Sequence, residues 1–528
     1  MDLKLYDTTL RDGAQRAGIS FSVEDKRAVA KRLDDLGIHY IEAGWPGSNP
    51  KDAEFFRRAG SLKLTHAVLV AFSSTRRAHI DASDDENLKA LMATGLQIFT
   101  LVGKAWDLHV TDVLQTDLEE NLKMIADSIR YLKSKGHTIF FDAEHFFDGY
   151  KSNPQYAIQV VRIAAEAGSD SVVLCDTNGG SLPREVTDIT TVVKDIDVPL
   201  GIHAHNDSDL AVVNTLVAVQ AGVTQVQGTI NGYGERCGNA NLCSVIPTLK
   251  LKMGVDCVTD QQLHKLTEVS HFVSEIANLS PDPHLPYVGN NAFTHKGGLH
   301  VSGLMRRDTS YQHIDPSLVG NRSQVLVSEL SGMSNVIYKA EELGLNIKKG
   351  KQAKIILDTI KSLESEGFQY EGAEASFEML IKRTQEGYKP AFELVDFMVV
   401  IEKRRRSPTT PSPEDVLSEA MVKVRVGTTV FHTAAEGNGP VNALDAALRK
   451  ALLQFYPNIS VVKLIDYKVR ILEESQGTEA KVRVLIESGD GDIEWRTVGC
   501  STNIIEASWF ALEDSMEYWL LRQGCCTA

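Results

Sequence analysis

Two histidines stand on alternate positions of a short apolar run, GIHAHND, at residues 201–207. Alternate residues of a β-strand face the same side, so His203 and His205 can point together. Such a pair can bind one cation through its two imidazoles. The same spacing also fits two hydrogen-bonded histidines in a polar interior, so the pair by itself leaves both interpretations open.

Two other motifs offer oxygen ligands. Asp12 in DTTLRDGAQ supplies a carboxylate, and Asn239 in GYGERCGNANL supplies an amide oxygen. Together with two imidazoles they would leave room for water or substrate on a six-coordinate ion. No thiolate is obvious in this set, which favours Mg²⁺ or Mn²⁺, with Zn²⁺ as the alternative. The four groups therefore predict a divalent metal site, provided that the fold brings them together.

Several further side chains have types suited to catalysis. Arg11 could stabilise a developing enolate or alkoxide, or could form a surface salt bridge. Glu144 in FDAEHFFDG ends an apolar run, where it could act on a substrate, bind a backbone amide or pair with Arg11. Thr177 in CDTNGG is a weaker candidate, because Thr at a strand end often caps a helix. His300, in the glycine-rich THKGGLHVSG, is a candidate general acid or base.

Eight short β-rich runs must position these groups, and segments with helical periodicity lie between most of them. Residues 22–37 show the helical pattern, with Ser22 as the expected N-cap, Asp25 three residues later and Gly37 at the end. Alternating strands and helices predict a parallel sheet. Eight such units in about 250 residues match a closed (β/α)₈ barrel. An open doubly wound sheet is the alternative, although no GxGxxG turn follows an early strand.

Barrel closure would bring the chemistry to one place. The strand ends form one rim, where active sites of such barrels are built. His203 and His205 fall on the seventh strand, Asp12 follows the first and Asn239 the eighth, and strand eight lies between strands seven and one. The residues expected at this rim are Arg11, Asp12, Glu42, Glu144, Asp176, Thr177, His203, His205 and Asn239.

Bulk composition excludes several classes of protein. The 528 residues are 43% hydrophobic and 24% charged, values typical of a globular chain of two to four domains. A net charge of −15 disfavours nucleic acid as a partner. No apolar run approaches about 18 residues, so we expect no membrane span. Seven scattered cysteines without CxxC spacing, and a first segment unlike a secretory signal, favour a cytoplasmic protein.

The chain is expected to have three parts. Residues 1–270 would form the catalytic barrel, 271–403 a mainly helical linker region that contributes to the active site, and 404–528 a regulatory and dimerisation α+β domain. The stretch RRRSPTTPSPED at 404–415 contains three prolines and short polar residues, which is typical of a linker. After it, two similar segments each read as strands followed by a helix, which suggests internal pseudo-symmetry.

The chain resembles the DRE-TIM metallolyase family, and within it the acyl-CoA-condensing synthases. DTTLRDGAQ, HAHND and GYGERCGNANL look like the signatures of that family, in the same order. GNGPVNALDAALRKAL and NIIEASWFALEDSMEYWLL are similar to the regulatory domain shared by isopropylmalate and citramalate synthases. EAGWPGSNPKDAEFF, AEHFFDGYKSNP, CDTNGG and THKGGLHVSG look most like the citramalate branch. The resemblance covers essentially the whole chain.

The resemblance implies an acyltransferase that condenses acetyl-CoA with pyruvate to give (R)-citramalate and CoA. A divalent metal would act as Lewis acid and template for pyruvate, and the thioester formed would then be hydrolysed. The implied metal ligands are Asp12, His203, His205 and Asn239. Isoleucine would inhibit the enzyme as the pathway product, a homodimer is expected, and the implied regulatory residues are Gly437, Asn438, Gly439 and Pro440.

The same resemblance assigns roles to the other candidates. Arg11 would stabilise negative oxygen, and Thr177 would hold the pyruvate carboxylate. Glu144 would position acetyl-CoA and assist proton abstraction. His300 and Tyr311 would act from the linker region, across a dimer.

One position departs from the family pattern. Ser302 stands two residues after His300, where related synthases often carry an acidic residue. A base role of His300 would therefore depend on another carboxylate.

Three alternatives remain open at this point. Isopropylmalate synthase would share the metal site and have a larger oxo-acid pocket, whose walls we expect around Phe72, Leu101 and Tyr150. A lyase that cleaves a carbon–carbon bond of an acyl-CoA is a second enzyme alternative. A non-catalytic amino-acid sensor, with the barrel as a scaffold, is the alternative of another class.

Overall fold

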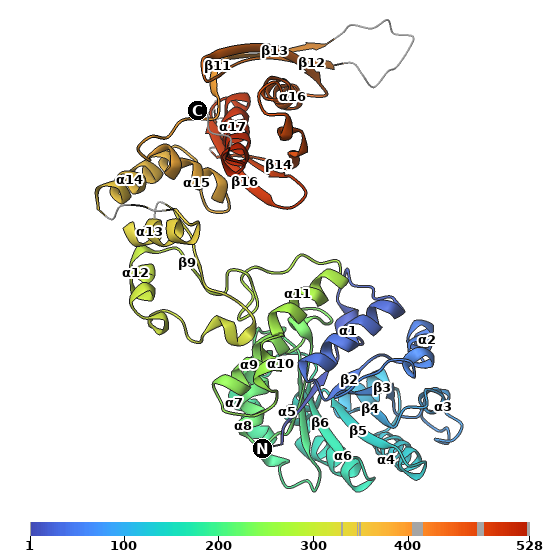
Figure 1. The fold of residues 1–528 in the computed structure, drawn as a ribbon. Helices are drawn as coiled ribbons and strands as arrows, with labels where there is room; N and C mark the ends of the chain where they lie inside the picture. The colour runs from blue at the N-terminus through green and yellow to red at the C-terminus, as the bar shows by residue number, and fades with distance from the viewer. Residues whose placement is uncertain are drawn as a thin grey trace, which may run out of the picture. The chain divides into compact units, whose positions relative to one another are not determined.

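A computed structural model describes residues 2–328, 331–345, 347, 350–403, 416–472 and 480–524. It divides into two compact units, Met1–Phe293 with Ile314–Ser323, and Thr294–His313 with Gln324–Ala528 (Figure 1). The expected linker at 404–415 lies outside the described residues.

The first unit is built on a closed barrel of eight parallel strands in sequence order. Strand β8 pairs with both β7 and β1, which closes the sheet. Each of the eight expected runs contains one strand, so the predicted (β/α)₈ barrel is confirmed. The strands are β1 (Lys4–Asp7), β2 (Tyr40–Glu42), β3 (Val68–Ser74), β4 (Ile98–Lys104), β5 (Thr138–Glu144), β6 (Ser171–Asp176), β7 (Leu200–Ala204) and β8 (Gln225–Gly228).

Helices surround these strands (Figure 1). They are α1 (Val23–Leu36), α2 (Pro50–Ala59), α3 (Glu86–Ala93), α4 (Leu118–Ser134), α5 (Phe146–Ser152), α6 (Pro154–Glu166), α7 (Pro183–Val192), α8 (Ala211–Gln220), α9 (Leu242–Leu251), α10 (Asp260–Leu263) and α11 (Leu266–Ile276). Four short turns of other helix types complete the unit: η1 (Gly13–Gln15), the π-helix η2 (His109–Val113), η3 (Ile230–Gly232) and η5 (Pro316–Val319).

Helix α1 shows how local sequence sets these elements. Ser22 accepts a hydrogen bond from the Asp25 backbone N–H, and Asp25 accepts one from the Ser22 backbone, which forms the expected capping box. Gly37 ends the helix in the left-handed region, with φ of 90°. Val29 and Leu33, on the buried face, are inaccessible to solvent. The helix limits predicted from residues 22–37 are therefore confirmed.

The barrel separates an outer core from its own interior. The large hydrophobic core lies between the strands and the helices. Inside the barrel a small separate cluster is formed by Tyr6, Val70 and Phe140, with Tyr40 and Ile98 packed against it. This cluster fills part of the barrel interior. The cavity of the described residues opens beyond it, toward the carboxyl ends of the strands.

The second unit begins with short elements and helices. They are β9 (Thr294–His295), α12 (Gly298–Arg306), η4 (Asp308–Ser310), β10 (Gln324–Val325), α13 (Met333–Glu342), α14 (Lys351–Ser365) and α15 (Glu374–Arg383). Strands β9 and β10 form a two-stranded parallel sheet.

Two three-stranded sheets with one helix each follow. The first repeat is β11 (Glu393–Lys403), β12 (Val416–Val426), β13 (Thr429–Gly437) and α16 (Pro440–Leu452). The second, after η6 (Pro457–Val461), is β14 (Lys463–Ile471), β15 (Val482–Gly489), β16 (Glu494–Ser501) and α17 (Ile504–Arg522). The expected pseudo-symmetric repeat is present, and one hydrophobic core contains residues of both halves.

Strand β11 differs from the sequence-based expectation. Residues 393–403 were expected to belong to a mainly helical region, but they form a strand that pairs antiparallel with β12. Leu394, Phe397 and Val399 pack toward the core, with a register shift between Leu394 and Asp396. In this strand apolar residues recur at the period of two that is typical of β-structure. The bulge inserts one residue and so interrupts that period in the sequence. The first repeat therefore starts before residue 404.

A buried group of charges joins α15 to α17. Arg383 pairs with Asp514 at 2.7 Å and with Glu517 at 2.8 Å. Glu517, 2% exposed, also accepts a hydrogen bond from the backbone N–H of Ala391. Glu513 lies in the same group, so one guanidinium faces three carboxyl groups.

Replacement of Glu513 by Gln should remove a pH-dependent loss of stability. Burial raises the pKa of Glu513 to about 7, an effect that Arg383 opposes and that Asp514 and Glu517 reinforce. From pH 4.5 to 7 the folded carboxyl keeps a proton that the unfolded chain has lost, so stability falls as the pH rises through this window. The full effect is at most roughly 3 kcal/mol.

Thermal unfolding followed by tryptophan fluorescence between pH 5 and 8 measures this effect. Glu513→Gln should show a flatter pH profile than the wild type. Glu494→Gln, on the exposed part of β16, is the matched control and should follow the wild-type profile. Identical profiles for Glu513→Gln and wild type would contradict the prediction.

Candidate metal centre and active site

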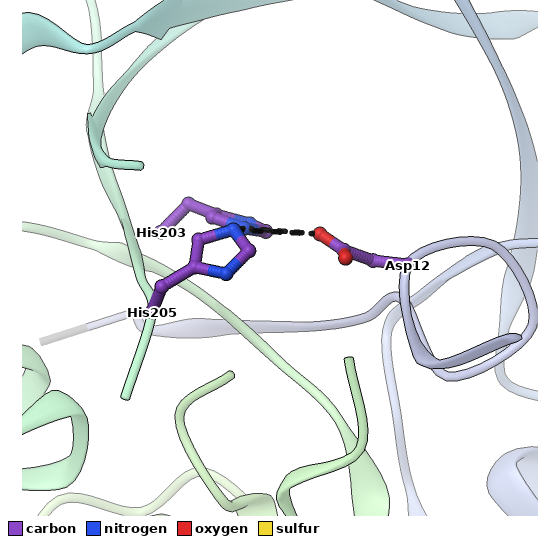
Figure 2. A group of neighbouring side chains, drawn as sticks. All are labelled: Asp12, His203 and His205. Carbon is purple, nitrogen blue, oxygen red and sulfur yellow. Dashed lines mark hydrogen bonds and ion pairs between the residues drawn. The ribbon is translucent and has the colours of Figure 1, made fainter. Parts of the chain in front are cut away.

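Three predicted metal ligands meet at one point of the barrel rim. Figure 2 shows the imidazoles of His203 and His205 turned toward the carboxylate of Asp12. Asp12 Oδ2 lies 3.3 Å from His203 Nε2 and 3.8 Å from His205 Nε2, and the two Nε2 atoms are 3.2 Å apart. All three residues are buried, and their ligand atoms lie within 4.8 Å of one another. This spacing suits one small cation.

Asn239 joins this group from the loop after β8. Its Nδ2 donates to Asp12 Oδ2 at 3.1 Å and lies 3.0 Å from His203 Nε2. The glycines of the loop make this approach feasible. A Cβ at Gly234 would lie 1.7 Å from Asn239 Oδ1, and one at Gly238 would lie 1.9 Å from a backbone oxygen. Both glycines have positive φ, so the loop needs residues without side chains to bring Asn239 inward.

The donor set fits a divalent cation. Among the residues that the structure describes, Asp12 Oδ1, His205 Nδ1 and Asn239 Oδ1 are buried without a hydrogen-bond partner. Buried polar atoms normally have partners, so the two orphaned oxygens of Asp12 and Asn239, beside the paired imidazoles, fit a site for a bound cation. A half-turn of the Asn239 amide would present its oxygen in place of its nitrogen. Two imidazole nitrogens with carboxylate and amide oxygens suit Mg²⁺, Mn²⁺ or Zn²⁺.

Electrostatics keep Asp12 and His205 in ligand form. Burial lowers the pKa of His203, but the adjacent Asp12 outweighs burial and raises this pKa above its ordinary value. Burial raises the pKa of Asp12, but the Arg11 guanidinium and the imidazole of His203 outweigh it and hold the pKa well below its usual range. Burial, reinforced by His203, lowers the pKa of His205 to about 3. Asp12 is therefore a carboxylate and His205 a neutral imidazole at neutral pH, the forms that bind metal.

Arg11 is held beside the cluster by a buried carboxylate. Its Nε donates to Glu42 Oε1 at 2.6 Å, and its Nη1 lies 3.4 Å from Asp12 Oδ2. The guanidinium also stacks over the Phe72 ring, 4.0 Å from its centroid. Glu42 in turn accepts hydrogen bonds from Tyr6 and from Thr8. Its side chain is fully buried under Arg11, so it orients the guanidinium and does not itself reach a ligand.

A cavity of about 550 Å³ opens above these groups. Six of the nine residues expected at the rim line it: Arg11, Asp12, Glu144, Thr177, His203 and His205. Asn239 reaches the ligand cluster, and Glu42 lies one layer below. Asp176 is not among the described residues that line the cavity. It accepts hydrogen bonds from Ser181 and lies near Asn214, behind the rim.

The expected pocket walls are only partly correct. Phe72 lines the cavity, whereas Leu101 is buried in the outer core and Tyr150 packs against Phe146. Successive residues of a strand face opposite sides, so the inward neighbour on β4 is Val102 rather than Leu101. Trp45 completes this wall and packs edge-on against Phe72.

Lys104 is a cavity residue that sequence reasoning missed. It ends β4 beside the end of β5, in register with Glu144, and the two side chains form an ion pair. Its place at the end of an apolar run, GKAW after QIFTLV, is the same signal that identified Glu144. A rule that includes every charged residue at a strand end would have found it.

Thr177 contacts Arg236, a second residue that sequence reasoning missed. Arg236 donates to the backbone oxygen of Thr177 at 2.7 Å and to both oxygens of Asp207 at 2.8 and 2.9 Å. Thr177 Oγ1 accepts from the backbone N–H of His145 at 2.9 Å. The sequence gives a weak signal for Arg236, its place inside the glycine-rich loop.

His300 and Tyr311 belong to the second unit. Their rings stack with centroids 4.3 Å apart at an angle of 21°. Both side chains are exposed. The two residues therefore form one small surface of the second unit.

The residues expected to be regulatory surround the start of α16. Gly437 ends β13, and Gly439 precedes the first helical residue, Pro440. The backbone N–H of Asn438 donates to Asn442 Oδ1 at 3.1 Å. A cavity of about 730 Å³ lies beside α16 and the beginning of β14, lined by Asn442 and mostly apolar side chains.

Family models match three consecutive parts of the chain. Residues 2–273 match the HMGL-like family, residues 287–367 the homocitrate synthase post-HMGL domain-like family, and residues 371–520 the LeuA allosteric (dimerisation) domain. The first match spans the whole barrel, including the candidate metal site. The chain belongs to the HMGL-like family.

Comparison with individual relatives shows which enzymes of the HMGL-like family this chain resembles. The chain is 55% identical to (R)-citramalate synthase of Geobacter sulfurreducens over 98% of this chain and 97% of the relative. It is 54% identical to (R)-citramalate synthase of Aquifex aeolicus over 98% of both chains. The 2-isopropylmalate synthase of Methanocaldococcus jannaschii is 31% identical, over 98% of this chain and 95% of the relative. Within the family, this chain therefore groups with the (R)-citramalate synthases.

Among the described residues, no helix is both long enough and apolar enough to cross a bilayer.

Proposed function

We propose that this chain is an (R)-citramalate synthase, a metal-dependent acyltransferase that condenses acetyl-CoA with pyruvate and hydrolyses the resulting thioester. The observation that carries the proposal is the buried cluster of Asp12, His203 and His205, which faces a cavity beside Arg11. Identity of 55% over nearly the whole length of a citramalate synthase supports the choice of reaction.

Metal binding rests on four residues in this proposal. Asp12, His203 and His205 hold a divalent cation, and Asn239 adds its amide oxygen after a half-turn. A bound Mg²⁺, Mn²⁺ or Zn²⁺ supplies Lewis-acid chemistry and a template for the 2-oxo acid. The unpartnered atoms Asp12 Oδ1 and Asn239 Oδ1 support this assignment.

The remaining cavity residues bind substrate and move a proton. Arg11 stabilises negative charge on the oxo-acid oxygen, for which its approach to Asp12 is the support. Thr177 binds the carboxylate of pyruvate through its hydroxyl. Glu144 takes part in removing a proton from the methyl group of acetyl-CoA, with Lys104 holding its carboxylate in place.

His300 and Tyr311 complete the site from a second copy of the chain in this proposal. Their stacked, exposed rings are suited to meeting another surface. The match to a dimerisation domain supports a homodimer. We further infer a cytoplasmic enzyme of isoleucine biosynthesis.

A 2-oxo-acid panel tests the reaction. Release of CoA from acetyl-CoA, followed with a thiol reagent, should be faster with pyruvate than with 2-oxoisovalerate. EDTA should abolish it, and added Mn²⁺ or Mg²⁺ should restore it. Faster turnover with 2-oxoisovalerate would instead support 2-isopropylmalate synthase, whose characterised relatives are more distant at 31% identity. Amino-acid binding without any CoA release would support the non-catalytic sensor.

We also propose that isoleucine binds beside α16 and inhibits the enzyme. The cavity there offers apolar walls, among them Ile459 and Leu464, for a branched side chain. No side chain caps the start of α16, so the first-turn backbone N–H groups of Val441 and Asn442, which line this cavity, are suited to a carboxylate.

Gly439→Leu should abolish this inhibition while turnover continues. Nothing lies within 4 Å of a Cβ at Gly439, and its φ of −163° is extended backbone that any residue adopts. Gly439 precedes Val441 and Asn442, which line the cavity, so in this proposal the added side chain blocks the place of the ligand carboxylate without straining the fold. Initial rates against isoleucine concentration should become flat in this variant. Glu436→Ala, on the adjacent strand, is the control and should stay inhibited by isoleucine. Gly427→Ala is not used as a control, because Gly427 has a positive φ.

Unchanged inhibition of Gly439→Leu by isoleucine would contradict the proposed place of binding. Inhibition of the wild type by leucine or valine, with no response to isoleucine, would contradict the proposed ligand.

A further inference from the structure

A chain of buried hydrogen bonds runs from His203 to the far side of the barrel interior. His203 Nδ1 lies 2.8 Å from Gln227 Oε1, and Gln227 Nε2 donates to Asp142 Oδ1 at 3.2 Å. Gln227 is inaccessible to solvent, while His203 and Asp142 are 5% and 3% exposed. No water competes at Gln227, so these partners alone determine its orientation.

The topology of the barrel creates this contact. Strands β7 and β8 pair in parallel with His203 opposite Gln227. Opposite residues of neighbouring strands face the same side, so both side chains point into the barrel. Asp142 reaches the same interior from β5. The contact therefore follows from the register of β7 against β8, and it persists in any state that keeps the barrel closed.

The direction of each hydrogen bond follows from the chemistry of the amide. In the structure the NH₂ group of Gln227 faces Asp142, which accepts at Oδ1, and the amide oxygen faces His203. Asp142 in its carboxylate form can only accept, so it holds the amide in this orientation. An amide oxygen only accepts, so Nδ1 of His203 must carry a hydrogen. A neutral imidazole has one such hydrogen, which leaves a lone pair on Nε2.

We infer that Gln227 is a positioning residue for metal binding, because it fixes His203 in the tautomer whose Nε2 lone pair faces Asp12 and His205. Asp142 acts one step further back by fixing the orientation of the Gln227 amide. The inference rests on the proposed metal site and goes beyond its four ligands. Partners of this kind typically change metal affinity by about 10- to 100-fold when they are removed.

Mn²⁺ binding to the metal-free full chain tests the inference without any turnover. Free Mn²⁺ is measured by electron paramagnetic resonance during titration at pH 7.5. Gln227→Met keeps the length of the side chain and removes both hydrogen bonds, so its Kd for Mn²⁺ should rise about 10- to 100-fold. Gln225→Met is the matched control, since Gln225 is a buried glutamine on the same face of β8 with an unpartnered Nε2 among the described residues. Its Kd should stay within about twofold of the wild type.

Gln227→Glu separates positioning from packing. The carboxyl group of this variant keeps an acceptor for Nδ1–H of His203 and loses the NH₂ group that faces Asp142. If Gln227 acts through its hydrogen bond to His203, Gln227→Glu should bind Mn²⁺ more tightly than Gln227→Met at pH 7.5 and stay within about 10-fold of the wild type.

The outcomes are distinct. If the wild type binds Mn²⁺ and Gln227→Met binds it equally well, the inference is overturned and the metal site stands. The same conclusion follows if Gln227→Glu binds Mn²⁺ no more tightly than Gln227→Met. Should Gln227→Met fail to fold, a loss of affinity above about 10-fold in Gln227→Glu relative to the wild type overturns the inference. If the wild type binds no Mn²⁺, the metal site of the proposed function fails, and this inference fails with it.

Discussion

His203→Ala is expected to lower kcat by at least about 1,000-fold while the barrel stays folded. The variant removes one of three ligands that lie within 4.8 Å of one another. Loss of the cation would remove several kcal/mol of charge stabilisation in the transition state, and about 4 kcal/mol corresponds to a factor of 1,000. Asp12→Ala should have an effect of the same order, because Asp12 Oδ2 approaches both imidazoles.

CoA release under saturating substrates measures kcat, and far-ultraviolet circular dichroism with a thermal melt checks the fold. His66→Ala is the matched control, since His66 is an exposed histidine of the same barrel that precedes β3. It lies at the opposite end from the rim and should keep wild-type kcat. Wild-type turnover in His203→Ala would refute the metal assignment.

Arg11→Lys is expected to lower kcat by about 100- to 1,000-fold. Arg11 contacts Glu42, approaches Asp12 and stacks on Phe72 at the same time. The compact ammonium of Lys cannot keep the stacked geometry together with both contacts, although it keeps the charge. An interaction that forms only in the transition state should be lost, so kcat should fall more than KM changes.

Steady-state kinetics with pyruvate as the varied substrate separates kcat from KM. Arg16→Lys is the control, since Arg16 lies five residues further and faces Tyr233, with its guanidinium carbon 5.4 Å from that ring's centroid. It should leave both parameters near the wild-type values. A rise in KM with unchanged kcat for Arg11→Lys would assign Arg11 to ground-state binding of the oxo acid instead.

Several features of the site could be read from the sequence because they are local. The period of two placed His203 and His205 on one face, and the order of strands in a closed barrel brought Asp12 and Asn239 to them. The role of the glycines around Asn239 also followed from local rules. The structure bears this out, since a Cβ at Gly234 would collide with the Asn239 side chain.

Other features depended on register and could not be read in this way. Leu101 and Val102 are adjacent and apolar, and only the pairing of β4 with its neighbours decides which of them faces the cavity. Asp176 ends a strand as Glu144 does, yet it serves the loop around Ser181. The strand at 393–403 was hidden by a bulge, because one extra residue breaks the period on which strand prediction relies.

The sequence by itself determined the barrel, the set of side chains that meet in the candidate metal site and the family to which the chain belongs, because these follow from periodicity, strand order and motifs. Only the tertiary structure decided which groups support that centre: Glu42 under Arg11, Lys104 against Glu144, and Gln227 behind His203. The physical reason is that these contacts join different strands across 24 to 40 residues of chain. Their partners are set by the register of the closed sheet, and no local pattern records that register.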